Sequence, residues 1–251
     1  MQKFNSAGVE IAYRDEGHGY PVLLIHGFAS NMRVNWVATG WHKTLLDAGY
    51  RLIMIDNRGH GESGKLYDSS QYAATMMAED ARRLLDHLGI ARAAVMGYSM
   101  GARISAFLTL LHPDKVECAV FSGLAERLVT GVGGAEAIAQ GLEAETMTDV
   151  TDPGARSFRL FAEQTKSDRL ALAACIRSSR VKIKAEALVA IRCPVLVVAG
   201  SEDDVAGAVQ PLVDMIPGAR GVTLPGRNHM NAVGDRGHKQ AVLAFLAEAT
   251  V

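Results

Sequence analysis

Short apolar runs alternate along this chain with longer segments of helical periodicity, and this alternation restricts the fold strongly. The segments between the runs, such as residues 104–111 before Pro113, have the spacing of amphipathic helices. The runs themselves are predominantly apolar and end at turn-forming residues, which is typical of strands buried on both faces. The pattern predicts the α/β class, with a mostly parallel sheet flanked by helices. The runs occupy residues 21–25, 51–55, 93–96, 117–121 and 194–199.

The alternation stops in the second half of the chain. Residues 124–190 contain helical periods and a glycine-rich loop but no strand pattern. The strand pattern resumes at Cys193 and is followed by a final helix, so the interruption lies inside one domain. We therefore expect a single domain over residues 1–251, with a core of 1–123 and 191–251 and a helical insertion over 124–190.

A G-x-S-x-G pattern, Gly-Tyr-Ser-Met-Gly at residues 97–101, indicates a nucleophile elbow. It directly follows an apolar run and directly precedes a helical segment, which is the strand–turn–helix setting that the motif requires. In such a turn a Cβ at Gly97 or Gly101 would clash, and Ser99 must adopt a strained backbone conformation. The alternative is a flexible Gly-Ser loop. The context favours Ser99 as a nucleophile.

A serine hydroxyl becomes a good nucleophile only when a nearby base accepts its proton, and that base needs a carboxylate to orient it. His229 is the best-placed base, because it lies in a glycine-rich loop between a short apolar run and the last helix. A Gly-Ser-Glu-Asp-Asp segment follows the strand predicted over 194–199. Asp203 is our choice for the acid, and its neighbours Glu202 and Asp204 remain alternatives.

The other histidines have weaker claims. Most are expected in loops or on polar helix faces, where a solvated surface position is the rule. His60 is the exception, since it lies in a glycine-rich segment after a predicted strand. The histidines expected at the surface are His18, His42, His87, His112 and His238.

A tetrahedral oxyanion needs preorganised N–H donors. The Met100 amide would lie at the N-terminus of the helix that follows the elbow, where the helix dipole adds to its effect. A second donor must come from a loop at the end of another strand, and the His-Gly-Phe segment at 26–28 places Phe28 there. We expect the amides of Phe28 and Met100 to form an oxyanion hole.

Taken together, these segments resemble the α/β-hydrolase family, whose nucleophile, acid and base also follow the chain order Ser, Asp, His. The resemblance implies an eight-stranded sheet with a helical cap between strands six and seven, where the insertion lies. A serine at the elbow separates this chain from the haloalkane dehalogenases and epoxide hydrolases of the family, which carry aspartate there. The chain departs from many relatives at Arg227-Asn228, where they have a small residue and glycine. The matching segments are 26–28, Asp-Asn-Arg-Gly-His-Gly-Glu-Ser at 56–63, 97–101, 200–203 and 228–229.

A nucleotide-binding loop is the rival interpretation of residues 59–65, which spell G-x-G-x-x-G and nearly spell a P-loop. A P-loop needs a hydroxyl after its lysine to hold Mg²⁺, but Leu66 follows Lys65. A dinucleotide fingerprint needs the helix to open within the glycine run, whereas here the helix is expected near Ser69 or Ser70. We interpret the segment as a tight structural loop whose Arg58 and His60 orient the site.

Composition excludes several other classes. With 26 basic and 27 acidic residues among 251, the net charge of −1 predicts neither nucleic-acid nor membrane-surface binding. Three widely spaced cysteines predict neither disulfides nor a metal site, and indicate a reducing compartment. Without an apolar signal region or spanning segment, the chain is expected to be cytoplasmic.

These features predict a serine hydrolase that cleaves a small carboxylic ester or lactone without a cofactor. The same residues could hydrolyse a carbon–carbon bond or transfer an acyl group, and some proteins of this fold are small-ligand receptors. The partner is expected to be a small, largely apolar substrate, and the oligomeric state stays open. Apolar side chains near the entrance are expected to form the pocket wall. These are Phe28, Met32, Trp36, Met100, Phe158 and Phe161.

Overall fold

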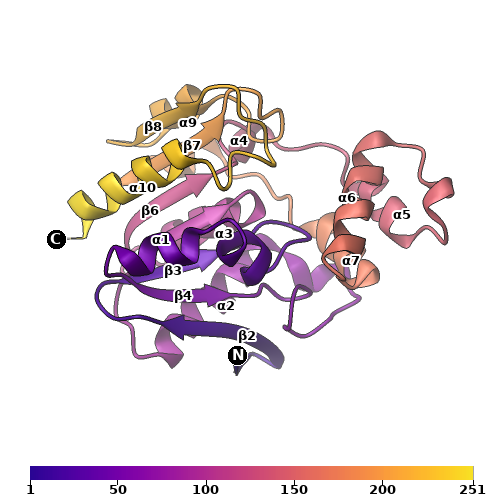
Figure 1. The fold of residues 1–251 in the computed structure, drawn as a ribbon, viewed down its shortest axis with the longest axis horizontal. Helices are drawn as coiled ribbons and strands as arrows, with labels where there is room; N and C mark the ends of the chain where they lie inside the picture. Colours follow the sequence, from indigo (N-terminus) through magenta and orange to yellow (C-terminus); the bar gives the residue numbers. More distant parts are fainter. Residues whose placement is uncertain (251) are drawn as a thin grey trace.

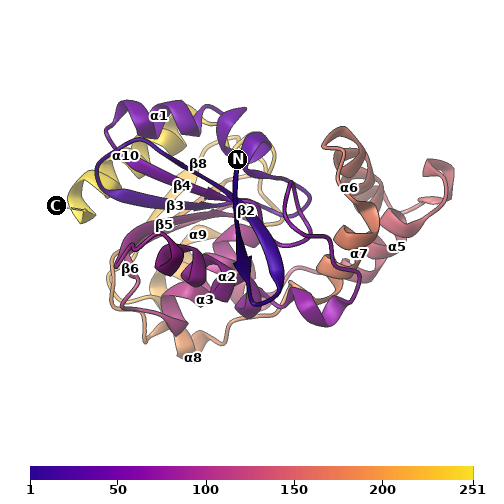
Figure 2. The ribbon, with the colours of Figure 1, turned by 90° about the horizontal axis from the view of Figure 1, so that it is seen from below.

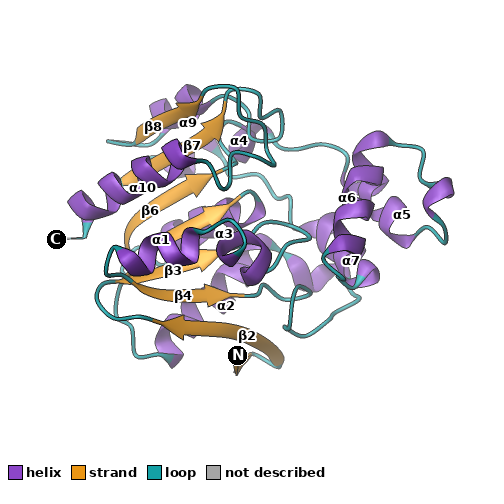
Figure 3. Ribbon diagram, in the orientation of Figure 1, coloured by secondary structure: helices purple, strands orange, loops and turns teal. Residues whose placement is uncertain are grey.

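The computed structural model describes residues 1–250, which form an eight-stranded sheet (Figure 1, Figure 3). The order across the sheet is β1-β2-β4-β3-β5-β6-β7-β8. β2 is antiparallel to its neighbours β1 and β4, and the other neighbouring pairs are parallel. The expected mostly parallel α/β sheet is therefore confirmed. The strands are β1 (Gln2–Ser6), β2 (Val9–Glu16), β3 (Pro21–Ile25), β4 (Arg51–Ile55), β5 (Ala93–Tyr98), β6 (Val116–Ser122), β7 (Val195–Gly200) and β8 (Arg220–Leu224).

Strands β3 to β7 begin and end within two residues of the predicted apolar runs. They are continuous runs because both of their faces are buried. In β3, Val22 and Leu24 belong to one hydrophobic core, whereas Leu23 and Ile25 belong to the other. β1 and β2 have no such run, because exposed or partly buried polar residues interrupt both strands.

Helices cover both faces of the sheet. Figure 2 shows α1 and α10 on one face and α2 and α3 on the other, in agreement with the two hydrophobic cores. The helices of the core are α1 (Trp41–Asp47), α2 (Ala74–His87), α3 (Met100–Leu111), α9 (Val209–Met215) and α10 (Arg236–Ala249), with a π-helical turn at Arg33–Val37 and a 3₁₀ turn at Ser69–Tyr72.

The residues between β6 and β7 are helical. Figure 1 shows α5, α6 and α7 beyond the carboxyl ends of the strands, apart from the sheet. One link to the core is the Ser178 hydroxyl, which donates a hydrogen bond to the Ser69 carbonyl at 2.5 Å. The helices are α4 (Arg127–Thr130), α5 (Ala135–Glu143), α6 (Pro153–Gln164), α7 (Arg169–Ser178) and α8 (Ala185–Leu188), with a 3₁₀ turn at Met147–Asp149.

The turn between β5 and α3 is tight, as the elbow motif requires. An added Cβ at Gly97 would lie 2.1 Å from the Gly101 carbonyl oxygen, and one at Gly101 would lie 1.9 Å from the Ile25 oxygen. Ser99 adopts φ 55° and ψ −113°, a conformation that residues with a side chain rarely adopt. The predicted steric roles of the two glycines and the strained serine are confirmed. In the part of the chain that the structure describes, no helix is both long and apolar enough to span a bilayer.

Gly101→Ala should lower the free energy of unfolding by about 3 kcal/mol or more, because the new methyl group would meet backbone that cannot rotate away. Urea unfolding followed by circular dichroism measures the loss. Gly133→Ala is the matched control, since an added Cβ there meets nothing within 4 Å. Equal stability of the two variants would show that the strand–helix contact tolerates a side chain.

Candidate active site

Three side chains from distant parts of the chain meet at the carboxyl ends of the strands. Ser99 lies between β5 and α3, Asp203 follows β7, and His229 follows β8. The His229 Nε2 atom is 3.0 Å from Ser99 Oγ, and its Nδ1 atom is 2.9 Å from Asp203 Oδ2. The carboxylate can only accept, so we assign the imidazole proton to Nδ1. Nε2 is then free to accept the serine proton.

The structure distinguishes Asp203 from Glu202 and Asp204 as the candidate acid. The Asp203 side chain is completely buried, and its Oδ1 accepts hydrogen bonds from the amides of Val205 and Ala206 at 3.1 and 2.9 Å. Glu202 and Asp204 are exposed. Among the three carboxylates, Asp203 is the one within hydrogen-bond distance of His229.

The loop that carries His229 is held from two sides. The Tyr98 hydroxyl donates a hydrogen bond of 2.6 Å to the His229 carbonyl. The Arg227 carbonyl accepts from the Glu202 amide at 3.0 Å, and the Arg227 Nε donates to Asp235 at 2.7 Å. The unusual Arg227-Asn228 pair therefore stabilises the loop and leaves the imidazole beside Ser99.

Two backbone amides beside Ser99 are available to a ligand. Within residues 1–250, neither the Phe28 amide nor the Met100 amide has a hydrogen-bond acceptor. The Met100 amide opens α3, so the helix dipole favours negative charge there. The preceding Gly27 amide donates to Asn35 Oδ1 at 3.0 Å, which fixes the start of the loop that carries Phe28.

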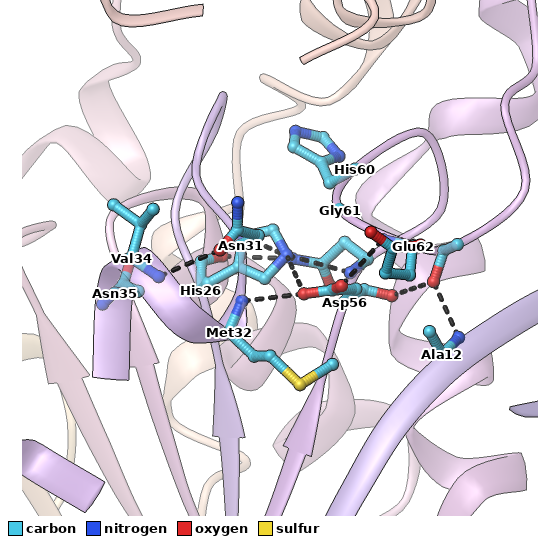
Figure 4. Close-up of polar contacts among 12 residues, drawn as sticks. Ala12, His26, Asn31, Met32, Val34, Asn35, Asp56, His60, Gly61 and Glu62 are labelled. Atoms are coloured by element: carbon cyan, nitrogen blue, oxygen red, sulfur yellow. Dashed lines mark hydrogen bonds and ion pairs between the residues drawn. The ribbon is translucent and has the colours of Figure 1, made fainter. Parts of the chain in front are cut away.

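A buried carboxylate, Asp56, holds that loop against the loop that follows β4 (Figure 4). Its Oδ1 accepts from the Met32 amide at 2.7 Å and its Oδ2 from the Glu62 amide at 2.9 Å. Burial raises the pKa of Asp56, and the hydrogen bonds from these two amides oppose that rise. The backbone around Phe28 is thereby tied to the second loop through one side chain.

His26 and His60 are both fully buried beside this carboxylate. The His26 Nδ1 atom lies 2.7 Å from the Gly27 carbonyl, and its Nε2 accepts from the Asn57 amide at 3.0 Å. A neutral ring satisfies both contacts, whereas a protonated ring would lose the second. Burial lowers the pKa of His26 to about 4. For His60, burial and the nearby His26 lower the pKa to about 3. In the described chain, neither ring forms a hydrogen bond with Ser99.

The glycine-rich loop over residues 59–65 is closed on itself. The Lys65 ammonium donates to the carbonyls of Gly61 and Ser63 at 2.6 and 2.5 Å, so the lysine is engaged by the loop. Arg58, which we expected to orient the site, instead forms a buried ion pair with Asp80 at 2.7 Å. These contacts agree with the interpretation of residues 59–65 as a tight structural loop.

The position of His238 differs from the one that the sequence predicts. We expected it at the surface, but it is 1% exposed. Its Nε2 lies 2.8 Å from Ser122 Oγ and its Nδ1 lies 3.0 Å from the Ala232 carbonyl. The polar neighbours of His238 in the sequence hide the fact that the first turn of α10 faces the sheet. Burial lowers its pKa to about 4.

A cavity of about 710 Å³ opens onto Ser99 and His229. Phe28, Met100, Phe158 and Phe161 line it, as we expected of apolar wall residues. Sequence reasoning missed Arg103, Ser179 and Arg180, which also line it. Arg103 could have been found, because it lies one helical turn after the serine on the same face of α3. Nothing in the sequence of the insertion indicates that Ser179 and Arg180 line the cavity.

Met32 and Trp36 were wrong choices for the cavity wall. They are 1% and 0% exposed and belong to the core between the sheet and helices α1 and α10. Trp36 belongs to the π-helical turn at Arg33–Val37, and Met32 immediately precedes that turn. Val34 and Asn35, from the same turn, line the cavity instead.

The buried histidines predict a loss of stability in acid. A lowered pKa in the folded state means that the unfolded chain binds more protons below pH 6.5, so the free energy of unfolding falls as the pH falls. At pH 5, His26, His60 and His238 should each reduce it by about 2 kcal/mol relative to pH 8. Urea titrations at the two pH values test this.

Single variants sharpen that test. His238→Gln should lower proton uptake on unfolding at pH 5 by about one proton, because its folded pKa is about 4. His18→Gln, at an exposed position, is the matched control. Equal effects of the two substitutions would contradict the assignment of a buried neutral ring.

Comparisons with known proteins agree with this architecture. A family model described as the alpha/beta hydrolase fold matches residues 20–132. A non-heme chloroperoxidase of Kitasatospora aureofaciens is 39% identical over 97 residues, which make up 38% of this chain and 32% of that protein. The matches to curated relatives span less than half of each relative's length.

Solved structures match over nearly the full chain. A hydrolase from Pseudomonas aeruginosa PA01 is 27% identical, with a TM-score of 0.81 over 98% of this chain and 97% of that chain. A structure described as an N-acyl homoserine lactone degrading enzyme is 25% identical, with a TM-score of 0.76 over 97% of this chain and 99% of that chain. By its fold and by these matches, the chain belongs to the alpha/beta hydrolase fold superfamily.

Proposed function

We propose that this protein is a serine hydrolase that cleaves a small carboxylic ester or lactone through an acyl-enzyme on Ser99. The observation that carries the proposal is the unbroken hydrogen-bond chain from Ser99 through His229 to Asp203, with contacts of 3.0 and 2.9 Å, at the wall of a cavity. The similarity to a lactone-degrading enzyme supports the same class of reaction.

Acylation begins when the Ser99 oxygen attacks the ester carbonyl and His229 Nε2 accepts its proton. The Asp203 carboxylate stabilises the imidazolium and keeps Nδ1 protonated. Negative charge develops on the carbonyl oxygen, where the free amides of Phe28 and Met100 donate hydrogen bonds. As the tetrahedral intermediate collapses, His229 gives its proton to the leaving alcohol, and the acyl group stays on Ser99.

Deacylation repeats these steps with water. His229 Nε2 accepts a proton from water, whose oxygen attacks the acyl carbon, and the same amides hold the second oxyanion. The Ser99 oxygen leaves with the proton from His229, so serine and imidazole return to their starting states. The carboxylic acid product then departs.

The cavity wall indicates what kind of acyl group fits. Phe28 and Phe158 meet edge to face, with ring centroids 5.5 Å apart, so one wall combines a core loop with the inserted helix α6. We propose that residues 124–190 act as a cap over Ser99 and that the acyl chain is small to medium and largely apolar.

All three cysteines are free thiols, which accords with a reducing compartment such as the cytoplasm.

Ser99→Ala should abolish turnover of short p-nitrophenyl esters and labelling by a fluorophosphonate probe, because no oxygen remains for the acyl group. The wild-type protein should be labelled at Ser99, as identified by mass spectrometry of the modified peptide. The unfolding curve should stay close to that of the wild-type protein, since alanine at this position carries a similar backbone strain. Unchanged ester turnover by this variant would refute the proposed nucleophile.

Asp203→Asn should reduce kcat by roughly 10⁴-fold, because an amide can stabilise the wrong imidazole tautomer and not the imidazolium. Glu202→Gln and Asp204→Asn are matched controls, since each removes one neighbouring exposed carboxylate. Both controls should keep kcat within about twofold of the wild-type value. If kcat fell strongly in one of the controls and not in Asp203→Asn, the acid of the triad would be the residue changed in that control.

A further inference from the structure

The cavity beside Ser99 contains two arginines and no acidic residue in its wall. Among residues 1–250, neither Arg103 nor Arg180 has a carboxylate partner, although most other buried or partly buried arginines of the chain do. Uncompensated cations are costly to bury, so paired charges are the rule inside proteins. The wall of the cavity thus carries two positive charges and no carboxylate, in a chain whose total charge is −1.

Arg103 lies on α3, four residues after Ser99, and its backbone amide donates to the Ser99 carbonyl at 3.3 Å. Four residues correspond to about 6 Å along a helix. Its side chain, in a residue only 2% exposed, donates to the carbonyls of Val181 and Leu128 at 2.6 and 3.3 Å. These carbonyls satisfy N–H groups of the guanidinium but carry no charge to balance it.

Arg180 and Ser179 follow the end of α7, on the inserted helical segment. The Arg180 guanidinium donates to the Gly133 carbonyl, which again leaves its charge unbalanced. Ser179 is 2% exposed, and within residues 1–250 its hydroxyl has no hydrogen-bond partner. Buried hydroxyl groups nearly always have a partner. A buried hydroxyl without one, in the wall of a cavity and next to an arginine, indicates a polar ligand group.

The two guanidinium groups also influence each other. Burial lowers the pKa of Arg103 to about 10, and the charge of Arg180 contributes to that shift. Both side chains remain cationic near neutral pH. A bound anion would offset both the loss of hydration and the mutual repulsion, and charge-assisted hydrogen bonds from guanidinium to carboxylate are among the strongest in proteins.

We propose that the cavity binds a carboxylate at the far end of the substrate's acyl chain, held by Arg180 and Ser179 with Arg103 beside them. The proposal rests on the proposed function and narrows its substrate class to esters or lactones whose acyl chain ends in a carboxylate. The apolar residues Phe28 and Phe158 would contact the methylene groups between the two ends. The reacting carbonyl would lie at Ser99.

Binding is tested without turnover, in the Ser99→Ala background, with adipate as the probe and dimethyl adipate as its neutral counterpart. Calorimetry should show that adipate binds at least tenfold more tightly than the diester. In the same background, Arg180→Met should remove the preference for adipate over the diester, whereas Arg180→Lys should retain part of it. Arg177→Met is the matched control, three residues before Arg180 at the end of α7. Because Arg177 is paired with Glu136 and Glu143, this substitution should leave adipate affinity unchanged.

Turnover provides the second measurement, with monoethyl adipate compared with ethyl heptanoate. Arg180→Met should lower kcat/KM for the anionic ester at least tenfold and leave the neutral ester within about twofold. Adipate that binds no better than its diester, or equally well to Arg180→Met, would overturn the carboxylate subsite. If adipate binds as expected but neither ester is hydrolysed, the subsite stands and the hydrolase proposal fails.

Discussion

The contact between three backbone segments under the elbow is the constraint on which the rest of the site depends. The end of β3, the end of β5 and the first turn of α3 approach so closely that Gly97 and Gly101 have no space for a Cβ. This contact forces Ser99 into its strained conformation and presents its hydroxyl above the sheet. It also brings the loop after β3, which carries Phe28, close to the first turn of α3.

Much of the sheet could be predicted from sequence, because strands buried on both faces leave continuous apolar runs. Strands β3 to β7 were found this way, and β8 appeared as a short run before the His229 loop. β1 and β2 were not, since the polar residues of both strands leave no continuous apolar run. The spatial order of the strands depends on contacts between distant segments. Local periodicity therefore does not determine it.

The candidate site was predictable where a motif fixes the local backbone. Ser99 and His229 follow from their places after strands, but choosing Asp203 over its two neighbours required the direction of each side chain. Met32 and Trp36 were misplaced because apolar side chains of the cavity wall and of the core look alike in sequence, and these two pack in the core. The burial of His238 and the position of Arg180 depend on tertiary packing that local polarity does not report.

The hydrogen bond from Tyr98 to the His229 carbonyl has a mechanical consequence. Tyr98 immediately precedes Ser99, so the backbone that presents the hydroxyl also anchors the backbone that presents the imidazole. The relative position of the two groups is therefore set by a short bridge through one phenol ring. A displacement of the loop that carries His229 would therefore be transmitted to the elbow through this hydrogen bond.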